Sequence, residues 1–335
     1  MSEEDGGQNI GAGPPEVRVG VLGAGFAARR HVERLVTLPG VRVRAVTDPQ
    51  PDRARALAES CGADVVGGVE AVVDAGVDCL YVCVPPSEHG APETRAVEAG
   101  VPVFVEKPLA ADLTTAEDIG DRLTQAGLLA VAGYQWRYLD TLETARRLLA
   151  DAPARMVLGA WLDKAPRTPW WADQRCSGGQ MVEQATHLLD VARVLVGEVM
   201  TVRGDGAHDP AGPGDIVHAA TSTMRFDSGA VGSFSTTCLL PGGYRMAVEL
   251  FAPGLALTLT ERDLTVLDGD GRRTVTPLID PVLEADRQFV AAVRGDPADL
   301  RAPYQEALRT HRLAWAVAEA TRSGATVDLV EVVGG

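Results

Sequence analysis

Lysine is almost absent from this sequence: Lys107 and Lys164 are its only two, against 29 arginines. Long apolar runs are absent too. None reaches the ~18 residues of a membrane-spanning helix, so we expect no transmembrane helix. The N-terminal segment is acidic and rich in glycine and proline, without the basic start and apolar centre of a signal peptide. We therefore expect a disordered tail over residues 1–16 and a cytoplasmic protein.

Positive charge is scarce as well, with 31 basic against 46 acidic residues and a formal net charge of −15. This balance argues against nucleic acid or an anionic membrane as the main partner. The five cysteines form no Cys-x-x-Cys pair, so we expect idle thiols and no disulfide framework. With 46% apolar and 23% charged residues, the composition is that of an ordinary globular protein, and 335 residues suffice for about two domains.

The first half of the sequence alternates strand and helix patterns. Apolar runs of strand length recur, and the segments between them have helical spacing. Such an alternation predicts right-handed βαβ units around a parallel sheet. We expect strands at 17–25, 41–48, 77–86, 102–108 and 128–138, and helices at 26–38, 51–62, 88–100 and 114–127.

The pattern changes after about residue 137, where long strands are joined by turn signals. Asp-Ser-Gly and Asp-Gly-Asp-Gly are strong hairpin turns, so we expect a mostly antiparallel sheet in a second domain. The fold class is therefore α/β, with two domains. In the second we expect strands at 154–164, 217–240, 245–260 and 264–278, and helices at 139–150, 181–197, 282–294 and 303–323.

The first apolar run ends in a glycine-rich turn, "GVLGAGFAARRH", in which Gly23, Gly25 and Ala28 have G-x-G-x-x-A spacing. Gly23 permits a tight turn, Gly25 lets the backbone approach a pyrophosphate, and Ala28 lets the helix pack close to the sheet. The helix N-terminus at Phe26 and Ala27 faces the phosphate charge. We expect these residues to bind a dinucleotide cofactor; a plain tight turn is the structural alternative.

A dinucleotide site also needs an acid about 20 residues further on, at the end of the second strand. Asp48, in "RAVTDP", meets this requirement. Its carboxylate can accept both ribose hydroxyls and would repel a 2′-phosphate, which favours NAD. Arg53 and Arg55 lie close by in the sequence, so NADP stays open as the alternative.

Lys107, one of the two lysines, stands in "FVEKPLA" at the end of a predicted strand. Ligands of such folds bind at the carboxyl ends of the strands, so we expect Lys107 beside the nicotinamide. Its ammonium can hydrogen-bond a substrate hydroxyl and share in proton transfer. Glu106 is expected to anchor the strand end next to the cofactor, and Pro85 and His89 to shape the nicotinamide pocket. A lysine that merely solvates the rim is the alternative.

A second candidate group lies in "GGQMVEQATHLLD". Glu183 and His187 are four residues apart, which places them on one face of the predicted helix, with Asp190 near that face. Histidine is the side chain best suited to exchange a proton near neutral pH, and a neighbouring carboxylate can orient it. A structural histidine is the alternative. The three residues lack a further pair of ligands, so no metal is expected.

Four of the five tryptophans fall within 36 residues. Aromatic faces suit the C–H faces of a sugar or cyclitol ring, and Arg137 and Asp163 can bind its hydroxyls. Ordinary packing, or an interface between subunits, is the alternative. The four residues are Trp136, Trp161, Trp170 and Trp171.

In order along the chain, these motifs resemble the Gfo/Idh/MocA oxidoreductase family, the relatives of glucose–fructose oxidoreductase and inositol dehydrogenase. The resemblance covers about residues 17–330 and includes "AVTDP", "VCVPPSEH", "VEKP" and "GYQWRY". It implies a Rossmann NAD(P)-binding domain over 17–137. It further implies an α/β domain over 138–335 with a large open sheet, which binds substrate and forms dimers or tetramers. By resemblance, Lys107 is the family's EKP lysine and His187 its acid/base histidine.

These observations predict an NAD(P)-dependent oxidoreductase acting on a secondary hydroxyl of a sugar, cyclitol or sugar-derived intermediate. Lys107, Glu183 and His187 are the expected catalytic group. The family usually has aspartate where this chain has Glu183, and we expect this longer side chain to orient His187 or reach the substrate. A redox-neutral epimerase or glycoside-cleaving enzyme, and a non-catalytic sugar-sensing regulator, stay open. We expect a homodimer or homotetramer.

Overall fold

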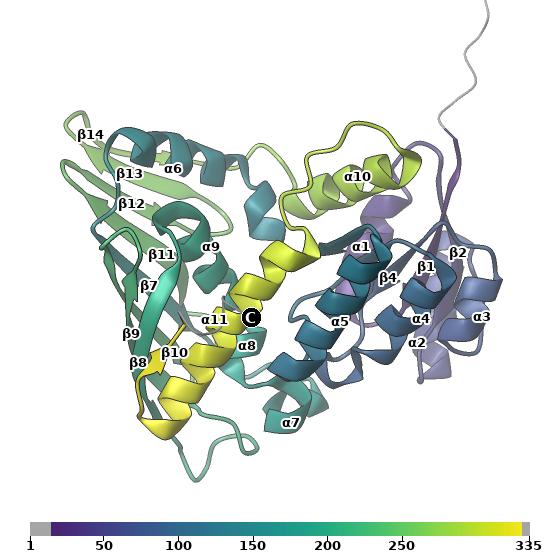
Figure 1. Cartoon of the computed structure of the whole chain (residues 1–335), viewed down its shortest axis with the longest axis horizontal. Helices are drawn as coiled ribbons and strands as arrows, with labels where there is room; N and C mark the ends of the chain where they lie inside the picture. The colour runs from purple at the N-terminus through teal and green to yellow at the C-terminus, as the bar shows by residue number, and fades with distance from the viewer. Residues whose placement is uncertain (1–14, 330–335) are drawn as a thin grey trace, which may run out of the picture.

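Two β-sheets, each from a different half of the chain, organise the molecule (Figure 1). The computed structural model describes residues 15–329. The first sheet has the order β3-β2-β1-β4-β5-β6, and every neighbouring pair is parallel. This is the doubly wound order of dinucleotide-binding folds. Its strands are β1 (Val17–Leu22), β2 (Val41–Thr47), β3 (Asp64–Val65), β4 (Cys79–Val82), β5 (Val103–Val105) and β6 (Ala130–Ala132).

The helices between these strands begin and end at the residues that local chemistry favours. Pro51 opens α2, and the Asp112 carboxylate accepts a hydrogen bond from the Thr115 amide at the start of α5. Glycines with positive φ, Gly62 and Gly127, close the same two helices. The five helices are α1 (Phe26–Leu35), α2 (Pro51–Cys61), α3 (Val69–Asp74), α4 (Ala91–Ala99) and α5 (Leu113–Ala126).

The predicted strands of the first half are confirmed in type and order, although each is shorter than expected. The prediction for 128–138 is wrong beyond Ala132, because Gln135–Tyr138 form a short 3₁₀ helix. The chain must turn there to enter α6 (Asp140–Asp151). A second short 3₁₀ helix, Pro86–Glu88, follows β4.

The second sheet has nine strands in the order β14-β13-β12-β11-β7-β10-β9-β8-β15. Neighbouring strands are antiparallel except for the parallel pair β7–β10, so the predicted mostly antiparallel sheet is confirmed. The hairpin turns predicted within 217–240 and 264–278 are confirmed, whereas the predicted strand 245–260 is itself a hairpin and β8 was not predicted. The strands are β7 (Met156–Leu162), β8 (Val199–Ala207), β9 (Ala219–Phe226), β10 (Val231–Thr237), β11 (Arg245–Ala252), β12 (Leu255–Leu259), β13 (Leu264–Asp268), β14 (Gly271–Val275) and β15 (Val327–Asp328).

The last two helices connect the two halves. α11 (Tyr304–Ser323) contacts α5 of the first half as well as α9 (Thr186–Val196) and β8 of the second, and in Figure 1 it runs between them. α10 (Pro281–Arg294) packs against α1. The predicted division near residue 137 therefore stays a prediction, because C-terminal helices lie against both sheets.

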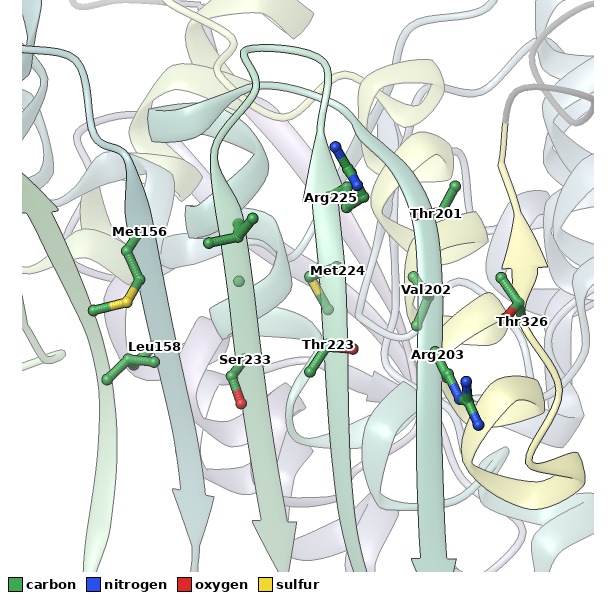
Figure 2. Close-up of a pocket in the computed structure, with 12 residues that line it drawn as sticks. Met156, Leu158, Thr201, Val202, Arg203, Thr223, Met224, Arg225, Ser233 and Thr326 are labelled. Atoms are coloured by element: carbon green, nitrogen blue, oxygen red, sulfur yellow. The ribbon is translucent and has the colours of Figure 1, made fainter.

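Helices cover one face of the second sheet, and the other face is open. Figure 2 looks onto this open face, where Met156, Arg203 and Arg225 lie, whereas the neighbouring Val202 and Met224 are buried in the core. Met156 is 39% exposed and Val231 is 49% exposed on the open face. The expected homodimer or homotetramer stays a prediction, for which this face offers apolar surface.

Residues 1–14 of the predicted tail lie outside the described residues. Between residues 15 and 329, the structure contains no helix with both the length and the apolar character needed to span a bilayer. All five cysteines are free thiols, as expected.

Candidate active site

A cavity of about 1660 Å³ opens at the carboxyl edge of the first sheet. Its lining combines the ends of β1, β2, β4 and β5 with the loop after β7 and with residues of α8 (Gln180–Glu183) and α9. Three residues predicted from the sequence are not part of this lining: His89, Arg137 and Asp163. The predicted residues that line it are Gly23, Gly25, Phe26, Ala27, Asp48, Pro85, Glu106, Lys107, Trp136, Trp170, Trp171, Glu183 and His187.

The glycine-rich turn forms one end of the cavity. Gly23 has a φ of +88°, and a Cβ there would overlap the carbonyl oxygen of Cys83, so only glycine fits. A Cβ at Gly25 would meet no atom within 4 Å, so this backbone borders open space. Helix α1 begins directly afterwards, at Phe26. A bare backbone at a helix N-terminus is the arrangement that binds a pyrophosphate.

Asp48 lies beside this turn, directly after β2. Its Oδ2 accepts from the Ala24 amide at 2.7 Å, and its Oδ1 accepts from the Gln50 amide at 2.7 Å. Each carboxylate oxygen keeps a further lone pair for a ribose hydroxyl. Together with the open cradle at Gly25, Asp48 provides what a dinucleotide requires, so the residues present fit NAD. Arg53, which kept NADP open, also lines the cavity.

Lys107 is held at the cavity wall by Glu183. Its Nζ donates to the Glu183 carbonyl oxygen at 2.7 Å and to Glu183 Oε1 at 2.9 Å. The other carboxylate oxygen, Oε2, accepts from the Trp171 indole nitrogen at 2.7 Å. The Lys107 and Glu183 side chains are only 17% and 14% exposed. The pair therefore joins the end of β5 to the second half of the chain.

Glu183 contacts Lys107 and Trp171 and does not hydrogen-bond His187 among the described contacts, contrary to one of our expectations. The predicted helix 181–197 is interrupted at Gln184, and the Ala185 amide bonds back to the Gln180 carbonyl. In a continuous helix the Glu183 carbonyl would accept from the amide of residue 187. Here it accepts from Lys107 Nζ, so the interruption of the helix creates a binding site for the lysine.

His187 is 4% exposed and lies among aromatic rings. The Trp136 ring is nearly parallel to it with centroids 6.0 Å apart, Trp161 lies at 6.2 Å, and Tyr134 is edge-on at 6.0 Å. Its Nδ1 is buried without a hydrogen-bond partner. Burial, and then the charges of Lys107 and Arg30, hold its pKa well below the usual value. The imidazole is therefore neutral at physiological pH and can accept a proton.

Arg137 and Asp190 form a buried ion pair with each other, away from the cavity lining. Arg137 Nε and Nη2 donate to the two Asp190 oxygens at 2.8 and 2.6 Å, and Thr310 donates to the same carboxylate. Buried charges require such partners. We therefore no longer assign Arg137 a substrate contact, and Asp190 does not orient His187.

His89 and Asp163 are also engaged elsewhere. His89 Nδ1 lies 2.6 Å from Glu93 Oε1, and both side chains are buried. Asp163 Oδ1 accepts from the amide of Lys164 at 2.7 Å. Neither side chain borders the cavity, so their predicted contacts with cofactor and substrate are not retained.

Among the cavity-lining residues to which the sequence reasoning assigned no role are Arg30, His31 and Glu261. His31 had a signal, because it shares the buried face of α1 with Ala28, Val32 and Leu35. Arg30 and Glu261 approach to 3.7 Å from distant parts of the chain, and no local pattern could have predicted that pair.

Comparison with known families agrees with this geometry. A model described as "Oxidoreductase family, NAD-binding Rossmann fold" matches residues 17–134, and one described as "GFO/IDH/MocA C-terminal domain" matches residues 154–253. Together they cover well over half of the chain. The chain thus belongs to the Gfo/Idh/MocA family of NAD-dependent oxidoreductases, as the motifs predicted.

Similar proteins act on polyols. A scyllo-inositol 2-dehydrogenase (NAD(+)) of Bacillus subtilis is 29% identical over 76% of this chain and 78% of its own length. A myo-inositol 2-dehydrogenase of Thermotoga maritima is 26% identical over 95% of this chain and 100% of its own. A levoglucosan dehydrogenase in complex with NADH and levoglucosan has a TM-score of 0.83 at 20% identity, covering 94% of this chain and 100% of its own; it shows the shared fold.

Asp190→Ala is expected to lower the free energy of unfolding by about 3–5 kcal/mol, because it leaves the buried Arg137 charge without its partner. Urea denaturation measures this loss. Asp299→Ala is the control, since it breaks a surface pair with Arg301 and should cost below about 1 kcal/mol. Equal losses in the two variants would contradict the buried role of Asp190.

Asp48→Ala is expected to weaken NAD binding by about tenfold or more, because it removes charge-assisted hydrogen bonds to the ribose. Isothermal titration with NAD and with NADP measures both affinities, and the preference for NAD should shrink. Asp52→Ala, which removes an exposed acid of α2, is the matched control and should leave both affinities unchanged. Unaltered NAD binding by Asp48→Ala would contradict the assignment.

Proposed function

We propose that this chain is an NAD-dependent dehydrogenase that oxidises a secondary hydroxyl of a sugar or cyclitol, or reduces the corresponding ketone. The observation that supports this most strongly is that Lys107 and His187 line the same cavity, which the glycine-rich turn also borders. A hydrogen-bond donor and a neutral base are what hydroxyl oxidation requires beside a hydride acceptor.

The turn residues Gly23 and Gly25 would hold the pyrophosphate of NAD, and Asp48 a ribose. When bound, the nicotinamide supplies the acceptor or donor of hydride. His187 accepts the hydroxyl proton at Nε2, because its Nδ1 is fully buried. Its low pKa keeps this nitrogen unprotonated in the resting state. In the reverse direction the imidazolium returns the proton to the ketone oxygen.

Lys107 binds the reacting oxygen. An ammonium has three N–H donors, and two are directed at the carbonyl and carboxylate oxygens of Glu183. The third is left for the substrate, where it stabilises the negative charge that develops on the oxygen as its proton leaves. Glu183 thereby directs the lysine, and Trp171 in turn directs Glu183.

The substrate class follows from the aromatic lining. Trp136, Trp161, Trp170 and Trp171 all border the cavity, and their faces suit the apolar C–H faces of a ring polyol. The named relatives act on inositols, and both inositols and sugars present such rings. A cyclitol or sugar is therefore the proposed substrate class, without a choice between individual compounds.

The proposal predicts that Lys107→Ala and His187→Ala each lower turnover by roughly 10²–10⁴-fold while NADH still binds, because each removes a group that acts on the reacting oxygen. Absorbance at 340 nm would be followed with inositols, hexoses, sugar nucleotides and their keto forms, each with NAD and NADP. Lys164→Ala removes the only other lysine, and His208→Ala an exposed histidine; both should retain full turnover.

Near-normal turnover in both catalytic-site variants would contradict the proposed roles. If NAD stays bound through purification and no compound gives net NADH, the proposed dehydrogenase function is replaced by that of a redox-neutral epimerase or glycoside-cleaving enzyme. A stable protein complex that a sugar dissociates without turnover would instead favour the non-catalytic regulator.

Glu183→Gln is expected to lower kcat about tenfold with a smaller change in KM, because the neutral amide directs the ammonium less strongly. Trp171→Phe removes the indole donor to Glu183 and should lower kcat less. The double variant should lose little more than Glu183→Gln alone, since both act through one contact. Glu88→Gln changes another acid of the cavity lining and is the control. Wild-type kcat in Glu183→Gln would contradict the directing role.

A further inference from the structure

Three charged side chains from distant parts of the sequence meet at the cavity wall, where His31 and Glu106 are part of the lining. His31 lies on α1, Glu106 follows β5, and Asp286 lies on α10. His31 Nδ1 is 2.6 Å from Asp286 Oδ1, and His31 Nε2 is 2.9 Å from Glu106 Oε1. The side chains are 4%, 0% and 14% exposed for His31, Asp286 and Glu106. The proposed reaction assigns no role to His31 or Asp286.

Glu106 connects this cluster to Lys107, the proposed catalytic lysine. Its second oxygen, Oε2, accepts a hydrogen bond from the backbone amide of Lys107 at 2.9 Å. The carboxylate also rests against Gly133, where an added Cβ would approach it to 2.8 Å. An unbroken chain of hydrogen bonds thus runs from Asp286 through His31 and Glu106 to the main chain of Lys107.

We propose that His31 and Asp286 are positioning residues that fix the Glu106 carboxylate, and through it the main chain of Lys107, at the cavity wall. The catalytic importance of this positioning rests on the proposed function of Lys107. The chain of hydrogen bonds is observed independently of that function. A helix near the C-terminal end of the chain thereby sets the position of a residue that ends a strand of the first sheet.

The charges around His31 support this role. Burial alone would lower the pKa of His31, but Asp286 and then Glu106 outweigh it and raise the pKa to about 9. His31 is therefore an imidazolium at neutral pH and donates to both carboxylates. Burial raises the pKa of Asp286 against the effect of His31. Burial also raises the pKa of Glu106, but His31 and then Lys107 outweigh it, so that the net pKa is lowered.

The other titratable groups near the cluster stay neutral in the relevant range. Tyr81 packs on the His31 ring, with centroids 5.2 Å apart; Cys79 lies on the same strand, and Cys83 directly follows that strand. Burial raises the pKa of all three well above the usual values. A titration observed near pH 9 in this cluster would therefore belong to His31, with Lys107 as the remaining charged neighbour of Glu106.

The scarcity of lysine makes a direct test available without any substrate. Labelling the full-length protein with [¹⁵N]lysine gives two amide signals, from Lys107 and Lys164. Both amides donate to the carboxylate of the preceding residue, Glu106 in one case and Asp163 in the other. The Lys164 signal is therefore an internal control: its amide has the same local hydrogen bond, and no described contact joins Asp163 to a histidine.

At pH 7, His31→Gln and Asp286→Asn are both expected to shift the Lys107 amide signal and leave that of Lys164 in place. His311→Gln alters another buried histidine, which is outside this chain of hydrogen bonds, and should move neither. In the unsubstituted protein the Lys107 signal should titrate with a midpoint close to 9, the value for His31. In Asp286→Asn this midpoint should fall by a unit or more, in the direction of about 6.5.

Stability provides the second measurement. The folded pKa of His31 is above its unfolded value of about 6.5, so its stabilising effect is complete below pH 6.5 and disappears as the pH rises through 9. His31→Gln should therefore raise the unfolding equilibrium constant most at pH 6, on the order of 100-fold, and progressively less towards pH 9.

If the chemical shift of the Lys107 amide is unchanged in His31→Gln and Asp286→Asn, the proposal is overturned. This holds even if both variants unfold at a lower temperature, because the cluster would then be structural only. If neither variant folds, the titration of the unsubstituted protein decides: no change in the Lys107 signal between pH 7 and 9.5 overturns it. These outcomes do not depend on turnover, so an inactive substrate panel would count against the proposed function alone.

Discussion

The contact between Lys107 and Glu183 is the interaction on which the rest of the site depends. It joins the end of β5 in the first sheet to the break between α8 and α9 in the second half of the chain. The cavity lies where these two segments meet, and both partners are mostly buried. Removing either would leave an unpaired charge at the wall, which is costly in a partly desolvated site.

This contact also explains why position 107 is lysine in a chain that uses arginine at nearly all its basic positions. An ammonium is compact and has three donors that rotate together, so it can serve a backbone carbonyl, a carboxylate and a third oxygen from one point. Arginine has a planar fork that matches a carboxylate with two parallel bonds, as at Arg137 and Asp190. That geometry suits a buried structural pair and not three separate acceptors.

Features set by neighbouring residues could be predicted from the sequence. The turn requires glycine at position 23 because a Cβ there would overlap the Cys83 carbonyl oxygen. Asp48 directly follows β2, about 20 residues after the turn, as in dinucleotide-binding βαβ units. The parallel arrangement of the strands in the first sheet follows from the same local patterns, and the presence of Lys107, Glu183 and His187 on one cavity agrees with the family resemblance.

Features that depend on distant contacts could not be predicted. Helical spacing placed Glu183 beside His187, but the helix is interrupted at Gln184, and the Glu183 carbonyl accepts from Lys107, 76 residues earlier. Arg137 looked like a substrate ligand until Asp190 and Thr310 were placed around it. Asp286 meets His31 across 255 residues, and nothing in either segment alone indicates the other.

The electrostatics of the cavity separate two roles that a single group could not perform. Glu183 pairs with the Lys107 ammonium, and the positive charge of this ammonium helps to lower the pKa of His187. The residue that we propose to stabilise negative charge on the substrate oxygen thus also lowers the pKa of the proposed base, so a hydrogen-bond donor and an acceptor coexist in one cavity. Both are possible because the Glu183 carboxylate pairs with the Lys107 ammonium and makes no hydrogen bond with His187 among the described contacts. A carboxylate bonded directly to His187 would raise its pKa and weaken this separation, and the break in the helix at Gln184 goes with the contact that occupies the carboxylate elsewhere.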